Sequence, residues 1–114
     1  MRCVPLLVTI AALAAACGVG EPVSRELGAR CDLATECDER CLVGGSYPGG
    51  FCSLACDNGV MCPGDSLCVE EAGGVCLFAC EANADCGFLG SGWRCVERGL
   101  HPGTPAKGKV CRGS

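Results

Sequence analysis

Fourteen cysteines in a chain of 114 residues constrain the fold most, because twelve of them lie between positions 31 and 111 in a repeating pattern. They form three units of four, residues 31–52, 56–76 and 80–111, and three residues separate each unit from the next. In every unit five residues separate the first two cysteines, an acidic residue follows the first cysteine, and an aliphatic residue follows the third. Agreement in both spacing and side chains indicates internal repetition. The twelve are Cys31, Cys37, Cys41, Cys52, Cys56, Cys62, Cys68, Cys76, Cys80, Cys86, Cys95 and Cys111.

Large apolar residues are too few in this region to build a substantial core, since they occur singly, as at Leu42, Phe51 and Val69. A domain of this size buries too little apolar surface to be stable without covalent crosslinks. A disulfide that closes a loop of about 15 residues stabilises the fold by roughly 3 kcal/mol in the chain-entropy description. We therefore predict a small disulfide-rich fold of three short four-cysteine repeats, with short β-hairpins and little regular secondary structure.

Two glycine-rich stretches predict hairpins. Residues 44–50 and residues 70–74 each lie between short apolar segments, an arrangement typical of two strands joined by a turn. We also expect one helical turn at residues 32–37. Four cysteines in a unit can pair in three ways. We favour a crossed pattern, first with third and second with fourth, because a bridge from first to second would leave the hairpin unclamped; the sequence leaves the other pairings open.

The N-terminus has the organisation of a secretory signal peptide over residues 1–16. A charged start, Met1-Arg2, precedes an apolar stretch that is too short and too rich in alanine for a comfortable membrane span. Small residues at 14–16 then directly precede Cys17. This order permits cleavage by an ordinary signal peptidase. It also resembles the lipobox of bacterial lipoproteins, in which the cysteine is acylated and becomes the new N-terminus.

The number of cysteines favours lipid attachment at Cys17. Loss of Cys3 with the signal peptide leaves an odd number, thirteen of the fourteen, and an odd cysteine in an exported chain requires an explanation. Acylation of Cys17 leaves twelve for disulfide bonds; the alternative is a free or intermolecularly paired thiol. Residues 17–30, which contain Gly, Glu, Pro, Ser and Arg without a sustained period, are predicted to be the lipid-attachment cysteine and a flexible tether. The disulfide-rich domain would then occupy residues 31–114.

Charge is unevenly distributed along the chain. Residues 21–85 contain twelve acids and three arginines, a balance of −9, whereas the residues from 94 onward carry +4. We interpret these charges as solvated surface groups that favour solubility. The basic stretch is short and lacks interleaved aromatic residues, so we expect no nucleic-acid binding.

The chain lacks the motifs of metal, redox and hydrolytic chemistry, and we expect no metal, no cofactor and no enzymatic activity. The cysteine gaps do not match the Cys-x2-Cys of zinc sites, and no Cys-x-x-Cys redox pair occurs. His101, the only histidine, is expected to be a solvated loop residue. The acids at positions 32, 36, 38 and 39 lack the alternating ligands and central glycine of a calcium loop, and we interpret them as solvated.

Trp93, the only tryptophan, admits two interpretations. In a small disulfide-rich domain a tryptophan usually packs against the disulfides. The alternative is an exposed aromatic anchor for a partner beside Arg94 and Arg98, because tryptophan and arginine are enriched at interface hot spots. These three residues are the candidate partner-binding site.

Two short motifs carry a family resemblance: Gly-Gly-Phe-Cys at 49–52 and Cys-Pro-Gly-Asp-Ser-Leu-Cys at 62–68. Together with the lipobox and the Cys-x5-Cys repeats, they resemble the cysteine-rich lipoproteins of the myxobacterial type over essentially the full length. The spacing of the first unit alone also resembles the colipase and dickkopf fold, which pairs in a crossed manner, and the start of an EGF module.

This resemblance implies lipid anchoring and brings no general biochemical activity with it. We expect a non-enzymatic, lipid-anchored structural or interaction module outside the cytoplasm, bound to the membrane through its lipid and to an unidentified protein or glycan partner. Gly18 follows the lipid cysteine, where an Asp would retain some lipoproteins at the inner membrane, so we expect the outer membrane. The alternative is a freely secreted cysteine-rich ligand or inhibitor.

Overall fold

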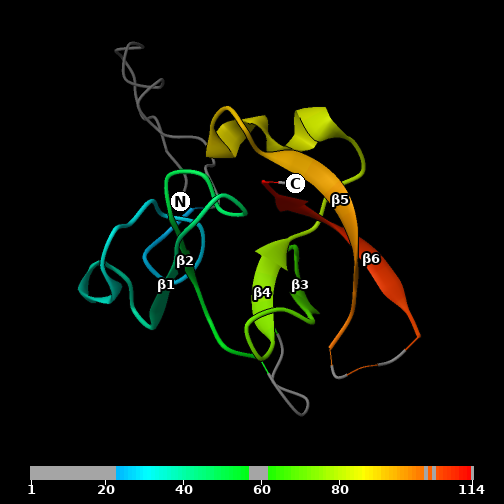
Figure 1. The fold of residues 1–114 in the computed structure, drawn as a ribbon, viewed down its shortest axis with the longest axis horizontal. Helices are drawn as coiled ribbons and strands as arrows, with labels where there is room; N and C mark the ends of the chain where they lie inside the picture. The colour runs from blue at the N-terminus through cyan, green and yellow to red at the C-terminus, as the bar shows by residue number, and fades with distance from the viewer. Residues whose placement is uncertain (1–22, 57–61, 102, 104, 114) are drawn as a thin grey trace, which may run out of the picture.

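Three antiparallel hairpins, one from each four-cysteine unit, form the framework of the domain (Figure 1). The computed structural model describes residues 23–56, 62–101, 103 and 105–113. Strand β4 contacts both β2 and β6, so the second hairpin lies between the other two. The described residues contain little other regular structure, which confirms the predicted fold class. The elements are η2 (Ala34–Glu36), β1 (Arg40–Leu42), β2 (Phe51–Ser53), β3 (Ser66–Val69), β4 (Val75–Phe78), η3 (Asn83–Leu89), β5 (Arg94–Gly99) and β6 (Lys107–Arg112).

Each unit contains two disulfides, six in all. They join its cysteines in the crossed order, first to third and second to fourth, which confirms the favoured pairing. The third and fourth cysteines of every unit lie opposite each other in the hairpin. Each of them nevertheless bonds to a cysteine upstream of the hairpin. In every hairpin, one pair of facing cysteines is therefore linked by two disulfides to the segment that precedes the hairpin. The bridges are Cys31–Cys41, Cys37–Cys52, Cys56–Cys68, Cys62–Cys76, Cys80–Cys95 and Cys86–Cys111.

Glycine is required at one equivalent position in the first two hairpins. Gly50 and Gly74, each two residues before the fourth cysteine of its unit, have φ values of 85° and 106°. A Cβ on Gly50 would lie 1.8 Å from the carbonyl oxygen of Cys31, and one on Gly74 would lie 2.3 Å from that of Cys56. The absence of a side chain therefore lets the backbone at the first cysteine lie directly against the hairpin of the same unit.

The two predicted hairpins and the predicted helical turn are all present. Strands β1 and β2 flank residues 44–50, β3 and β4 flank residues 70–74, and η2 is a short 3-10 turn within residues 32–37. The third hairpin, β5–β6, was not predicted although its strands are the longest, with six residues each. Most of its residues are exposed or half-buried, so the apolar alternation that reveals a strand in a sequence is weak here.

One apolar cluster extends through all three units. The ring of Phe51, which is fully buried, lies 5.8 Å from that of Phe78 and 5.4 Å from that of Trp93, measured between centroids. Phe51 belongs to the first unit and Trp93 to the third, and Phe78 ends β4, the strand that completes the hairpin of the second unit. Val110 on β6 is also fully buried, and its backbone bridges to Ala79 beside β4. The units are therefore parts of one core rather than independent beads.

The segment before the first unit is part of the folded domain over residues 23–30. Leu27 is buried in the apolar cluster, with 4% of its surface exposed. Gly28 donates its backbone N–H to Cys52 O at 2.8 Å, and Cys52 donates its own to Ala29 O at 2.9 Å. This corrects the expected tether for these residues, because an apolar side chain and a pair of backbone hydrogen bonds fix them to β2. The predicted signal peptide, Cys17 and the rest of the tether lie outside the described residues.

Candidate functional site

The three residues predicted to bind a partner do not form one exposed patch. Trp93 is only 6% exposed, and its Nε1 donates to Pro48 O at 2.9 Å, so the exposed-anchor interpretation of this residue is wrong. Arg94 is exposed at the start of β5. Arg98 Nε lies 3.0 Å from a carboxylate oxygen of Glu71. Burial of the indole completes the core between the first and third units, because its ring packs on Phe51 and its N–H has a backbone acceptor.

Arg98 belongs to a charged cluster that joins all three units. The Glu71 side chain is 12% exposed and lies between Arg98 and Arg112, with Arg112 Nε 2.6 Å from it. The hydroxyl of Tyr47 donates to the other carboxylate oxygen. Burial raises the pKa of Tyr47 to about 12, and the hydrogen bond to the Glu71 carboxylate and its negative charge act in the same direction. Here the acidic middle and basic end of the chain pair with each other, rather than both being solvated as the sequence suggested.

The single histidine is half-buried rather than solvated. The His101 side chain is 17% exposed, and its Nδ1 lies 2.9 Å from Glu70 Oε2. Its backbone N–H donates to Cys68 O at 3.0 Å. His101 therefore fastens the loop after β5 to the β3–β4 hairpin, and its ring is engaged by a neighbouring carboxylate.

Several acids near the cysteines hold backbone groups in place. The Glu36 carboxylate accepts the backbone N–H groups of Asp32 and Leu33, at 2.6 and 3.1 Å. In the third unit the equivalent Asp85 accepts those of Glu81 and Ala82, at 2.9 and 3.0 Å. These hydrogen bonds lower the pKa of both acids. The residue before the second cysteine therefore caps the 3-10 turn in both units.

Two other acids of the first unit also have partners. Asp38 Oδ1 lies 3.5 Å from Arg25 Nε, and Glu39 accepts the backbone N–H of Ala55 at 2.9 Å. The acidic turn that the sequence offered as a calcium candidate is thus partly engaged within the chain. Sequence reasoning assigned these carboxylates to solvent because their partners, the side chain of Arg25 and the backbone N–H of Ala55, are distant in the sequence.

Two adjoining hollows on the surface form a shallow groove, which we call the acidic groove. The first has a volume of about 410 Å³ and the second about 490 Å³, and both are lined by Gly64, Asp65 and Ala79. These volumes are in the range of small-ligand and side-chain pockets. The groove is lined by Ser24, Glu26, Leu27, Pro63, Gly64, Asp65, Ser66, Leu67, Phe78, Ala79, Cys80, Glu81, Asp85 and Phe88.

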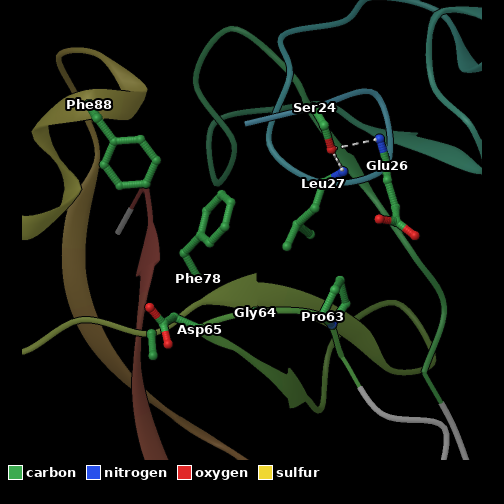
Figure 2. Close-up of a pocket in the computed structure, with 9 residues that line it drawn as sticks. Ser24, Glu26, Leu27, Pro63, Gly64, Asp65, Phe78 and Phe88 are labelled. Carbon is green, nitrogen blue, oxygen red and sulfur yellow. Dashed lines mark hydrogen bonds between the residues drawn. The ribbon is translucent and has the colours of Figure 1, made fainter. Parts of the chain in front are cut away.

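Apolar side chains from three parts of the chain form the floor of the first hollow. Figure 2 shows Leu27 and Phe78 beside each other, with Phe88 beyond the Phe78 ring. The Phe78 and Phe88 rings are 5.3 Å apart in an edge contact. Phe78 is 6% exposed, whereas Phe88 is 46% exposed. The inner ring therefore belongs to the core and the outer ring is available to a partner.

The N-terminal segment places one apolar and one acidic side chain at the groove. The hydroxyl of Ser24 accepts the backbone N–H groups of Glu26 and Leu27, each at 3.2 Å (Figure 2). This turn directs Leu27 into the core and leaves Glu26 exposed. Sequence reasoning missed the groove because its lining comes from the presumed tether, the second unit and η3, and no local pattern indicates that these segments meet.

The charge of the groove is negative. The described residues that line it include four carboxylates and no lysine, arginine or histidine. Within the described part of the chain, Glu26, Asp65 and Glu81 form no ion pair. By contrast, Glu70, Glu71 and Asp38 all have cationic neighbours. The acidic groove thus combines apolar surface with acidic side chains.

The comparisons with known proteins give no family. No protein-family model matches the chain, and neither do curated proteins or solved structures. Among the described residues, no helix is long and apolar enough to span a bilayer.

Proposed function

We propose that the protein is a lipid-anchored extracytoplasmic interaction module without catalytic activity, held at the outer membrane by acylated Cys17. The three clamped hairpins and their shared core make a small disulfide-rich domain, which is consistent with a structural or interaction role. Such bridges form and persist in oxidising compartments, which supports export.

One observation carries the proposal of a lipid anchor. All twelve cysteines between residues 31 and 111 are bonded to one another within their own units. The domain therefore offers Cys17 no disulfide partner. An exported chain with one cysteine left over requires another use for its sulfur. The small residues directly before Cys17 supply that use, because they resemble a lipobox.

The state of the protonatable side chains supports a non-catalytic role. The one histidine lies against Glu70, and the tyrosine has a pKa of about 12, which makes it a poor acid or base near neutral pH. Cysteines in disulfides supply no thiolate nucleophile. A binding role uses what the surface does present, a groove with apolar and charged walls.

The lipid anchor is tested by the mass and location of the mature protein. We expect an acylated N-terminal Cys17 and recovery in the membrane fraction, together with metabolic labelling by a fatty acid. The Cys17→Ser variant should lose the label and enter the soluble extracytoplasmic fraction, with its disulfides unchanged. Wild-type protein found soluble with an unmodified Cys17 would contradict the proposal and favour the secreted ligand or inhibitor.

A further inference from the structure

The acidic groove combines an exposed aromatic ring with a row of acidic side chains, and both can bind a peptide. Its first hollow presents the exposed face of Phe88 next to Phe78 and Leu27. An exposed aromatic ring is a source of binding energy when a partner excludes water from it. The three exposed large apolar residues of the described chain are Leu33, Val43 and Phe88, and only Phe88 lines the groove.

The acids around the hollow determine the charge of the occupant. Glu26 lines the first hollow, and Asp65 lines both. Glu81 and Asp85 line the second hollow. Asp85 already accepts two backbone hydrogen bonds, but its negative charge remains. Carboxylates around a low-dielectric surface attract cations and repel anions, so charge complementarity favours a positively charged partner.

We propose that the acidic groove binds a cationic peptide segment, in which an apolar side chain packs against Phe88 and Phe78 while flanking lysines or arginines face Glu26, Asp65 and Glu81. This rests on the proposed function as an interaction module and names the chemistry of its partner. The groove takes an extended segment because its two hollows adjoin along Asp65 and Ala79. The apolar contact supplies affinity, and the carboxylates supply selection by charge.

The test uses the mature chain with Cys17→Ser, which removes the need for detergent, after its mass has shown six disulfides. The probe is the capped tripeptide Lys-Phe-Lys, titrated against nitrogen-15-labelled protein by NMR. The comparison probes are Glu-Phe-Glu, Lys-Gly-Lys and a neutral N-acetylglucosamine trimer. We expect saturable shifts at the amides of Leu27, Asp65 and Phe88 with Lys-Phe-Lys, and weaker binding of every other probe.

Variants separate the two contributions. Phe88→Ala should weaken binding of Lys-Phe-Lys roughly tenfold, as loss of an aromatic anchor typically does. Asp65→Asn with Glu81→Gln should weaken it roughly three- to tenfold, and added salt should remove this difference. Leu33→Ala and Glu97→Gln are the matched controls, since both residues are exposed and lie outside the groove. Each control should bind like the parent.

Three results would overturn the proposal: equal binding of Glu-Phe-Glu, shifts that lie outside the groove, or preferential binding of the sugar trimer. Failure here leaves the lipid anchor standing if Cys17 proves acylated. An unmodified Cys17 would refute the anchor without affecting the peptide measurement. Each variant must retain its disulfides and the dispersed spectrum of the parent, so a loss of binding is not a loss of fold.

Discussion

The first and third units share a framework and differ in what they add to it. Both have crossed bridges and a 3-10 turn capped by a carboxylate, Glu36 in one and Asp85 in the other. The strands of the first hairpin have three residues each, whereas those of the third have six. The longer hairpin reaches the second hairpin, where Leu100 bridges to Val69 and Val110 bridges to Ala79, the residue after β4.

This comparison separates the disulfides, which act within each unit, from the side-chain contacts that join one unit to another. The disulfides fix each unit locally, and they do so in the same way three times. The contacts between units come largely from single residues that do not recur in every unit, notably the rings of the shared aromatic cluster and Glu71 with its ion pairs. Substitutions that remove contacts between units should therefore destabilise the whole domain. Substitutions of the capping carboxylates, Glu36 and Asp85, should mainly weaken the 3-10 turn of their own unit.

The largest loss of stability is expected when an aromatic ring is removed from the shared core. Phe51→Ala should lower the free energy of unfolding by about 3–5 kcal/mol, as loss of a buried phenylalanine typically does. The Phe51 ring contacts those of Phe78 on the second hairpin and Trp93 in the third unit, so all three hairpins should unfold together at the lower midpoint. Chemical denaturation with Phe88→Ala as the exposed control measures this. Equal destabilisation by the two variants would contradict a single shared core.

Removal of single bridges compares the two units directly. The Cys31–Cys41 bridge spans 10 residues and Cys86–Cys111 spans 25. Replacing either pair by serines should cost about 2–5 kcal/mol, and the longer loop should cost about 0.8 kcal/mol more from chain entropy. Burial of Cys86 and Cys111 adds to that difference. Thermal unfolding in the absence of reductant is the measurement, and a larger loss from the first unit would reverse the predicted order.

The link between units at Glu71 should have an intermediate effect. Glu71→Gln leaves Arg98 and Arg112 without their carboxylate and should destabilise the domain by about 1–3 kcal/mol. The variant should also lower the pKa of Tyr47, since the carboxylate contributes to raising it to about 12. Glu97→Gln is the control, because Glu97 is exposed and forms no ion pair among the described residues. Ultraviolet titration of the tyrosine follows the second effect; an unchanged pKa would show that Glu71 does not act on it.

The smallest effect concerns the caps, and it depends on pH. The pKa of Glu36 lies below its ordinary value of 4.5, and that of Asp85 below 3.8, because each carboxylate accepts two backbone hydrogen bonds. The stabilisation is therefore complete above those ordinary values and is lost as the pH falls through the lowered ones. Glu36→Gln should be less stable than wild type at neutral pH and approach it in acid. A stability difference that is independent of pH would refute the carboxylate cap.

The sequence predicted what the cysteine spacing determines. Repetition gave the three units, and the need to clamp each hairpin favoured the pairing that the structure contains. The turns around Gly50 and Gly74 were found because glycine-rich stretches between short apolar segments are typical of hairpins. Such features depend on residues near one another in the chain.

What depended on contacts between distant segments was missed or left open. The residues next to Trp93 in the sequence do not show whether it is buried or exposed. Its burial depends on the ring contact with Phe51 and the hydrogen bond to Pro48, both distant in the sequence. Leu27 lies in a stretch whose composition resembles a linker, and it is buried because β2 offers backbone partners beside it. The acidic groove likewise requires three segments to meet. Local pattern carries no information about such encounters.

The most direct test of the account is disulfide mapping of the mature protein by mass spectrometry without reduction, combined with the mass of its N-terminal peptide. The account predicts six bridges, each within one unit and crossed, and a Cys17 that carries acyl chains. A bridge between units, or a disulfide at Cys17, would contradict it.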